Sequence, residues 1–132
     1  MASAVEYGPA EVASYFHPQI EQLISKFGQK QDWTTVHRVI FYTINLIAQK
    51  KVPGGVFDAF FKTQIPFLKS YAENSASTMD EATQNAVDNS ISALISIMRH
   101  SPQVYGAEFD SFAQYALSHL PFRYFFNYLA IF

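Results

Sequence analysis

The sequence contains no cysteine, which excludes disulfide frameworks, thiolate nucleophiles and cysteine metal sites. It also has no excess of positive charge, because 9 Lys or Arg stand against 11 Asp or Glu, a net charge of -2. A chain without a basic field is not drawn onto phosphate backbones or anionic lipid, so we expect no direct nucleic-acid partner. No stretch reaches the roughly 18 uninterrupted apolar residues that a membrane span needs, so no span is expected.

Aromatic residues are what the sequence has in abundance. It carries 13 Phe and 8 Tyr among 132 residues, and 49% of the chain is hydrophobic while only 15% is charged. This composition is enough to build the core of one domain. Because few polar residues remain to cover the outside, we also expect some apolar surface to meet another surface.

The apolar residues recur at steps of three and four, and no segment alternates with a period of two, so the sequence predicts an all-α fold. The predicted helices cover about 9–28, 32–51, 56–71, 78–99 and 107–121, and 122–132 is a truncated or capping segment. Thr78 and Glu81 have the spacing of a capping box that opens the fourth helix. The Pro53-Gly54-Gly55 and Ser101-Pro102 stretches are predicted helix breaks.

Two regularities indicate an internal repeat. Pro18, Pro66 and Pro121 each fall within a predicted aromatic-rich helix, 48 and 55 residues apart. In addition, four apolar positions of one helix return 51 residues later in another: Val36, Ile40, Ile44 and Ile47 correspond to Val87, Ile91, Ile95 and Met98. Two-helix units with a period of about 40 to 50 residues are typical of HEAT-type solenoids. The alternative is a plain bundle of five amphipathic helices.

A family resemblance follows from two of these helices. Residues 84–98, which begin Gln84-Asn85-Ala86-Val87-Asp88-Asn89, resemble a helix found late in karyopherin-β proteins, the importin-β superfamily. Residues 36–49 are similar to the preceding helix of those proteins, which has an arginine near its start and Ala-Gln at its end. The Leu-Pro pair at 120–121 also resembles the end of their next helix. The similarity covers about 32 to 121 and is greatest to importins that carry ribosomal proteins and histones.

This resemblance implies a single HEAT-like helical-hairpin solenoid of about two and a half repeats. The units are a B-type helix at 9–28, repeats at 32–73 and 78–121, and the segment at 122–132. It further implies a protein-binding role in the cytoplasm and nucleus. The implied partners are protein cargo, nucleoporins with phenylalanine-glycine repeats and, as the weakest of the three, the Ran GTPase.

The resemblance also directs attention to individual residues. Cargo contacts in the family lie on the B-helix face, which points to the polar residues of 56–71 as a protein-binding set: Asp58, Lys62, Gln64 and Lys69. By contrast, Arg38, Asp88 and Asn89 lie in the early turns of the A helices, where such repeats place polar residues that bond to neighbouring units. We interpret these three as a structural ladder, because a charge between stacked helices is retained when it is paired. From spacing alone, Asp58 and Lys62 are expected to form an ordinary surface ion pair.

Catalysis and cofactors find no support in the sequence. The four histidines, at 17, 37, 100 and 119, lie in separate segments without the helical spacing of a zinc pair. No nucleophile elbow or phosphate loop is present, so we predict no enzyme activity, no metal and no cofactor. A small enzyme would require a polar cleft that holds His37 or His100 beside a carboxylate. The main alternative function is a structural or assembly protein that self-associates through aromatic faces.

Overall fold

The computed structural model describes residues 18–19, 21–22, 26, 34–50, 55–75 and 80–120. Within these ranges the chain forms helices and turns and no strand, which confirms the all-α prediction for this part of the molecule. Five residues of the predicted 9–28 helix are described, and all five are helical. The remainder of that helix and the 122–132 segment lie outside the described residues. No helix in these ranges is both long enough and apolar enough to cross a membrane.

Four α-helices and two short 3-10 turns make up the described fold. They are α4 (Thr34–Gln49), α5 (Asp58–Ser75), α6 (Glu81–His100), η2 (Pro102–Val104), η3 (Gly106–Glu108) and α7 (Phe109–Leu117). Pro66 lies inside α5, as predicted. It is exposed, so its ring occupies the outer side of the helix.

The start of α6 corrects one prediction. The N-cap is Asp80 and not Thr78, which lies outside the described residues. The Asp80 carboxylate accepts hydrogen bonds from the Thr83 backbone N–H at 3.1 Å and from the Thr83 hydroxyl at 2.6 Å. Aspartate is one of the preferred N-cap residues, because a short side-chain oxygen satisfies an otherwise unpaired N–H of the first turn. These bonds, chiefly that from the Thr83 hydroxyl, lower the pKa of Asp80.

The helix ends follow the predicted breaks at one site and differ at another. Ser101 caps α6, with its N–H bonded to the Ile97 carbonyl at 2.8 Å, and Pro102 follows in η2. The predicted fifth helix is shorter than expected, because α7 ends at Leu117 and therefore does not contain Pro121. A proline restricts the residue before it and lacks an N–H, so helices usually end upstream of one.

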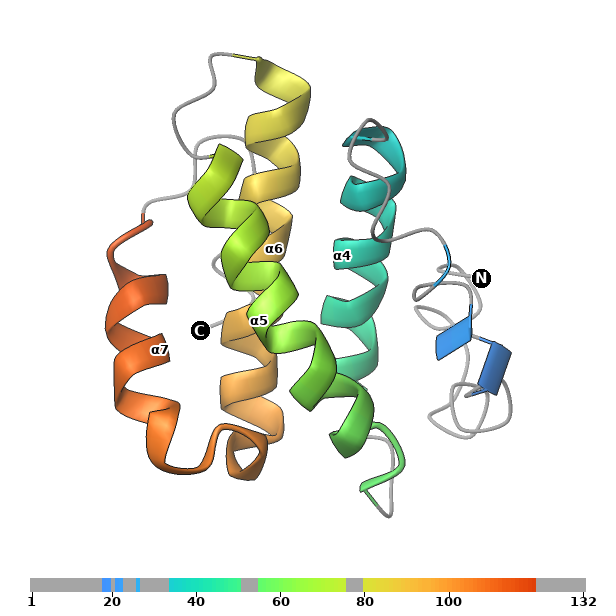
Figure 1. The fold of residues 1–132 in the computed structure, drawn as a ribbon, viewed down its shortest axis with the longest axis vertical. Coiled ribbons are helices and arrows are strands. Elements are labelled where there is room, and N and C mark those ends of the chain that lie inside the picture. The colour runs from blue at the N-terminus through green and yellow to red at the C-terminus, as the bar shows by residue number, and fades with distance from the viewer. Residues whose placement is uncertain are drawn as a thin grey trace.

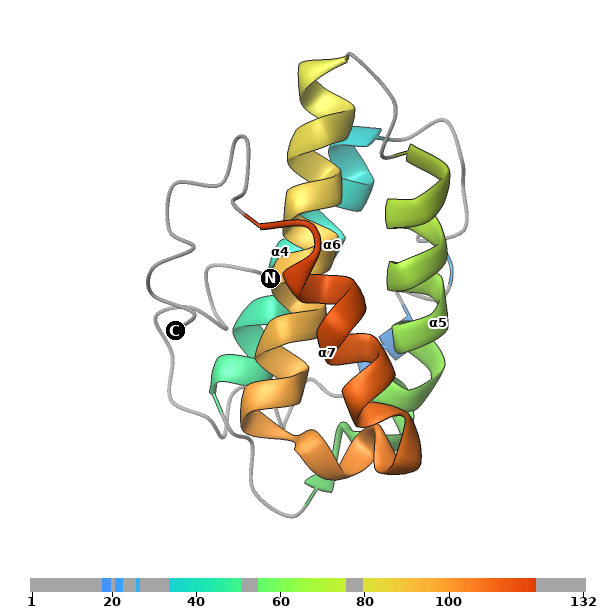
Figure 2. The same ribbon diagram turned by 90° about the vertical axis from the view of Figure 1, so that its left-hand side faces the viewer.

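α4 and α6 lie side by side and run in the same direction, whereas α5 and α7 run in the opposite direction (Figure 1). α5 packs against one face of the α4 and α6 pair. α7 lies at the edge of α6 that is remote from α4, as the turned view in Figure 2 also shows. In the order of the chain, α4 with α5 and α6 with α7 are therefore two successive helical hairpins.

Side-chain hydrogen bonds connect α4 to α6, and two of them join residues 51 positions apart. The Asn89 side-chain amide donates to the Arg38 carbonyl at 3.1 Å. The Ser96 hydroxyl donates to Asn45 Oδ1, which also accepts from the Gln49 side chain at 3.2 Å. The separation of 51 residues is the one at which the apolar pattern of the sequence repeats, so the two helices pack with equivalent positions at the same height.

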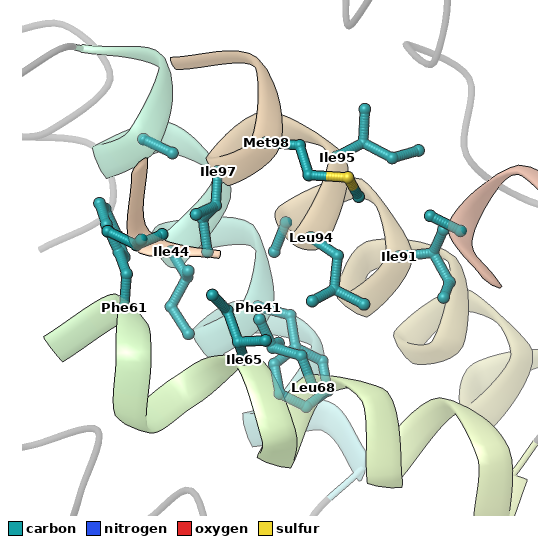
Figure 3. Packing of buried hydrophobic residues seen from close by; sticks show 14 of the residues in the cluster. Phe41, Ile44, Phe61, Ile65, Leu68, Ile91, Leu94, Ile95, Ile97 and Met98 are labelled. Carbon is teal, nitrogen blue, oxygen red and sulfur yellow. The ribbon is translucent and has the colours of Figure 1, made fainter. Parts of the chain in front are cut away.

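The hydrophobic core lies where α5 covers α4 and α6. Ile65 and Leu68 of α5 point toward Phe41 of α4 and Leu94 of α6 (Figure 3). Phe41, Leu68 and Leu94 are each fully buried. The phenylalanines at and near the start of α5 belong to this core: Phe57, Phe60 and Phe61 are buried and Phe67 is partly buried.

Candidate protein-binding face

The four residues predicted to contact a partner all lie on α5, but the structure places them in different surroundings. Lys62 is exposed and Lys69 is partly exposed. Gln64 is buried, with 9% exposure, because it falls on the same inward stripe as Phe60, Phe61 and Leu68. Gln64 is therefore not available to a partner, and this part of the predicted site is corrected.

Asp58 lies at the opposite end of α5 from Lys69, and it is not paired with Lys62 as expected. Its Oδ2 accepts a hydrogen bond from the Gln103 side chain of η2 at 3.3 Å. The ion pair that the structure does show on α5 is between Lys69 Nζ and Glu73 Oε1, at 3.7 Å. Both pairs have the i, i+4 spacing, so spacing alone did not distinguish which of them forms.

Lys69 stands at the contact between α5 and α7. Its ammonium nitrogen lies 5.2 Å from the ring centroid of Phe112 and 5.2 Å from that of Tyr115. The Tyr115 hydroxyl donates to the Lys69 carbonyl at 3.4 Å. The Tyr115 ring in turn meets the His119 ring edge-on, with centroids 4.8 Å apart. We call these four residues and Glu73 the Lys69 cluster.

The surroundings of the Lys69 cluster shift two of its titrating groups. Burial, assisted by the charge of Glu73, raises the pKa of Tyr115 to about 12. Burial lowers the pKa of His119, although the carboxylates of Asp88 and Glu73 act in the opposite direction. At neutral pH the imidazole of His119 is therefore mostly uncharged, and Lys69 is the cation of the cluster.

The Lys69 cluster contains the kinds of side chain that are common in protein interfaces, namely aromatic rings beside charged groups. Cation and aromatic-ring contacts of this geometry are attractive, and they keep ring faces covered by a side chain that can move. The Lys69 and Glu73 side chains are 34% and 52% exposed, so solvent reaches the cluster. Aromatic rings beside a few charged groups are typical of residues that dominate binding energy at interfaces.

The three residues predicted as a ladder lie at or near the contact between the two hairpins. Asn89 makes the hydrogen bond to the backbone of Arg38, while the Arg38 side chain is exposed. Asp88 is 7% exposed and lies close enough to His119 to influence its pKa. The link between hairpins is thus an amide to a carbonyl, and the guanidinium of Arg38 points to solvent.

The histidines that could have supported catalysis occupy other environments. His37 is buried among aromatic rings, with centroid distances of 5.8 Å to Phe41, 5.1 Å to Tyr71 and 6.2 Å to Phe67. His100 is partly buried at the end of α6. In the described ranges, no three His, Asp or Glu side chains gather in a way that could hold a metal ion.

Sequence reasoning missed Glu73, Phe112, Tyr115 and His119 as members of a site. A partial signal existed, because Glu73 follows Lys69, and His119 follows Tyr115, at the i, i+4 spacing. The aromatic surplus also has a different location from the one expected. Every described Phe and Tyr is buried or half-buried, so none offers a fully exposed aromatic face.

No protein-family model, curated protein or solved structure matches this chain.

Proposed function

We propose that this chain is a protein-binding helical-repeat module, similar to part of a nuclear transport receptor, and that it acts without catalysing a reaction. The observation that carries the proposal is the pairing of α4 with α6 at a separation of 51 residues. Stacked hairpins that repeat along one axis would give this pairing, because each unit then places equivalent residues beside those of the next.

A solenoid of about two and a half HEAT-like repeats is the architecture that accommodates this pairing. The α4 to α5 and α6 to α7 hairpins would be two units, each covering the apolar flank of its neighbour. Such proteins bind partners over an extended surface, and small rotations between units reshape that surface. In a plain bundle of five helices, the 51-residue separation of these polar contacts would not need to coincide with the spacing of the apolar pattern in the sequence.

The Lys69 cluster is the proposed binding face. It lies between the second helices of the two hairpins and presents a cation, a carboxylate and partly covered aromatic rings to solvent. Protein cargo and nucleoporins with phenylalanine-glycine repeats are the proposed partners, in the cytoplasm and nucleus. The Ran GTPase is the weakest of the proposed partners.

Titration of the whole chain with a phenylalanine-glycine repeat peptide tests the proposal by NMR. We expect the chemical shift changes to centre on Lys69, Phe112 and Tyr115. The Tyr115→Ala variant should bind about tenfold more weakly, since an aromatic anchor at an interface is worth more than 1 kcal/mol. Lys62→Ala, which alters an exposed residue of the same helix, should bind like the parent chain.

Two results would reject this function. The first is an absence of chemical shift changes at the highest peptide concentration used, together with no effect of the peptide on the melting temperature of the chain. The second is equal weakening by Tyr115→Ala and Lys62→Ala, because the peptide would then bind without using the Lys69 cluster.

A further inference from the structure

The chain enters α7 through a fixed residue that is followed by an unusual backbone conformation. Tyr105 is buried, and its hydroxyl donates to the Leu94 carbonyl of α6 at 2.7 Å. The next residue, Gly106, has a φ of 54°, a left-handed conformation that favours glycine. A Cβ at Gly106 would meet no atom within 4 Å, so the backbone has open space around it at this position. A fixed point and a pivot therefore lie side by side at the start of η3.

Beyond Gly106, few side chains attach α7 to the other helices. Only Phe112 and Ala116 of its residues are buried. The Phe112 ring lies 5.2 Å from the Tyr105 ring, measured between centroids, and the ammonium of Lys69 lies over Phe112 from the side of α5. α6, by contrast, is buried along most of its length. A short helix with few buried contacts is the kind of element that opens locally while the rest of a fold stays intact.

Lys69 supplies the part of this attachment that depends on charge. Its ion pair with Glu73 lies within α5, so that pair would survive a movement of α7. Its contacts with the Phe112 and Tyr115 rings join α5 to α7 and would be lost. A ring face attracts a cation, and it does not attract a neutral side chain in the same way. Loss of the Lys69 charge should therefore weaken the attachment of α7 in particular.

We propose that α7 is a lid, which swings away from α5 and α6 about Gly106 while Tyr105 stays bound to α6, and that the charge of Lys69 holds the lid closed. Opening would expose the buried ring of Phe112. It would also divide the Lys69 cluster, because Lys69 stays on α5 while Phe112 and Tyr115 leave with α7. The position of the lid thus sets the fraction of molecules in which the cluster is assembled. The inference concerns the chain without a ligand, so it does not depend on the proposed binding function.

Hydrogen exchange of the whole chain at low urea concentrations tests the proposal, under conditions in which the exchange rate reports the opening equilibrium. We expect the amides of α7 to share one opening free energy that is lower than that of α6. Their exchange should depend little on urea, because a local opening exposes little surface. The exchange of α6 should depend strongly on urea, because it requires unfolding of the whole core.

Substitutions at Lys69 test the role of the charge. Lys69→Gln should speed the exchange of α7 about three- to fivefold, because it removes the attraction to both rings. Lys69→Arg keeps a cation and should exchange like the parent chain. Lys62→Gln removes a charge from an exposed residue of the same helix and should also leave α7 unchanged.

Two further variants locate the pivot. Gly106→Ala should speed the exchange of α7 about fivefold or more, because alanine is strained at a φ of 54° and opening would release that strain. Tyr105→Phe removes the hydrogen bond to Leu94 but keeps the ring. Because that bond persists in both the closed and the open form, Tyr105→Phe should speed the exchange of α6 and leave the exchange of α7 unchanged.

Several outcomes would overturn the proposal. Exchange of α7 and α6 with the same opening free energy and the same urea dependence would show that no lid opens. Equal exchange of α7 in Lys69→Gln and Lys69→Arg would show that charge does not hold it closed. Acceleration of α6 but not of α7 in Gly106→Ala would remove the pivot from Gly106. Faster exchange of α7 in Tyr105→Phe would show that Tyr105 leaves α6 together with the lid.

Discussion

Buried polar side chains hold α4 and α6 in register. Asn45, Asn89 and Ser96 are 2%, 6% and 1% exposed, so each needs a hydrogen-bond partner inside the protein. They find partners in one another and in the Arg38 carbonyl. If α4 slipped by one turn along α6, these groups would be separated and left without bonds in a buried position. The apolar contacts would tolerate such a slip far better, because the hydrophobic effect has no direction.

Asn89→Ala tests this account of the register at a single residue. The substitution removes the donor to the Arg38 carbonyl, and we expect it to lower the free energy of unfolding by about 1 to 2 kcal/mol. Urea denaturation measures the loss. Gln114→Ala, on the exposed face of α7, is the control and should change stability by less than about 0.5 kcal/mol. Equal small effects of both substitutions would show that the amide does not contribute to the register.

At the scale of elements, the four helices are attached to the fold to different degrees. α6 is buried along most of its length, from Ala86 to Met98, because it contacts α4, α5 and α7. α7 is short, and only Phe112 and Ala116 of its residues are buried. Its attachment also uses Tyr115, whose hydroxyl donates to the Lys69 carbonyl of α5, and the Tyr115 ring meets His119 just after the end of α7. We therefore expect α7 to be the element most sensitive to changes in the Lys69 cluster.

The pKa of His119 gives this attachment a pH dependence. Burial lowers the folded-state pKa below the usual value of 6.5, so the folded protein binds the proton less readily than the unfolded chain. The contribution of uncharged His119 to the free energy of unfolding is therefore fully present above pH 6.5. It is lost as the pH falls from there through the lowered folded-state pKa. We expect His119→Gln to reduce this acid destabilisation, as measured by urea unfolding at pH values on both sides of 6.5. Identical pH profiles for the two proteins would contradict the assignment.

The elements themselves could be predicted from the sequence, whereas the site could not. Periodicity located the helices because stripes such as Phe60, Phe61 and Leu68 have to face the core. The N-cap was misplaced because Thr78 and Asp80 are both good capping residues, and the side-chain bonds to Thr83 decide between them. Gln64 was misjudged because its polarity was given more weight than its place on an apolar stripe.

The Lys69 cluster depends on how two distant segments meet. Lys69 and Tyr115 are 46 residues apart, and their contact exists only because α7 returns beside α5 after the turns η2 and η3. No local pattern in either helix encodes that distance. The 51-residue spacing could be found in the sequence because side-chain types repeat at that distance. The hydrogen bonds between α4 and α6 join residues at the same distance.

For the whole molecule, the account rests on parallel, in-register pairing of α4 with α6. This pairing places α4 beside α6 with residues 51 positions apart at the same height, and α5 and α7 run in the opposite direction. The repeat-module proposal depends on that arrangement. A different register would separate the Asn89 side chain from the Arg38 carbonyl and Ser96 from Asn45.

Nuclear Overhauser effects between α4 and α6 in the 15.0 kDa chain test this pairing most directly. The account predicts cross-peaks from the Asn89 side-chain amide to protons of Arg38 and from Asn45 to Ser96, both across 51 residues. Cross-peaks that instead join the beginning of α4 to the end of α6 would show antiparallel packing and would contradict the account.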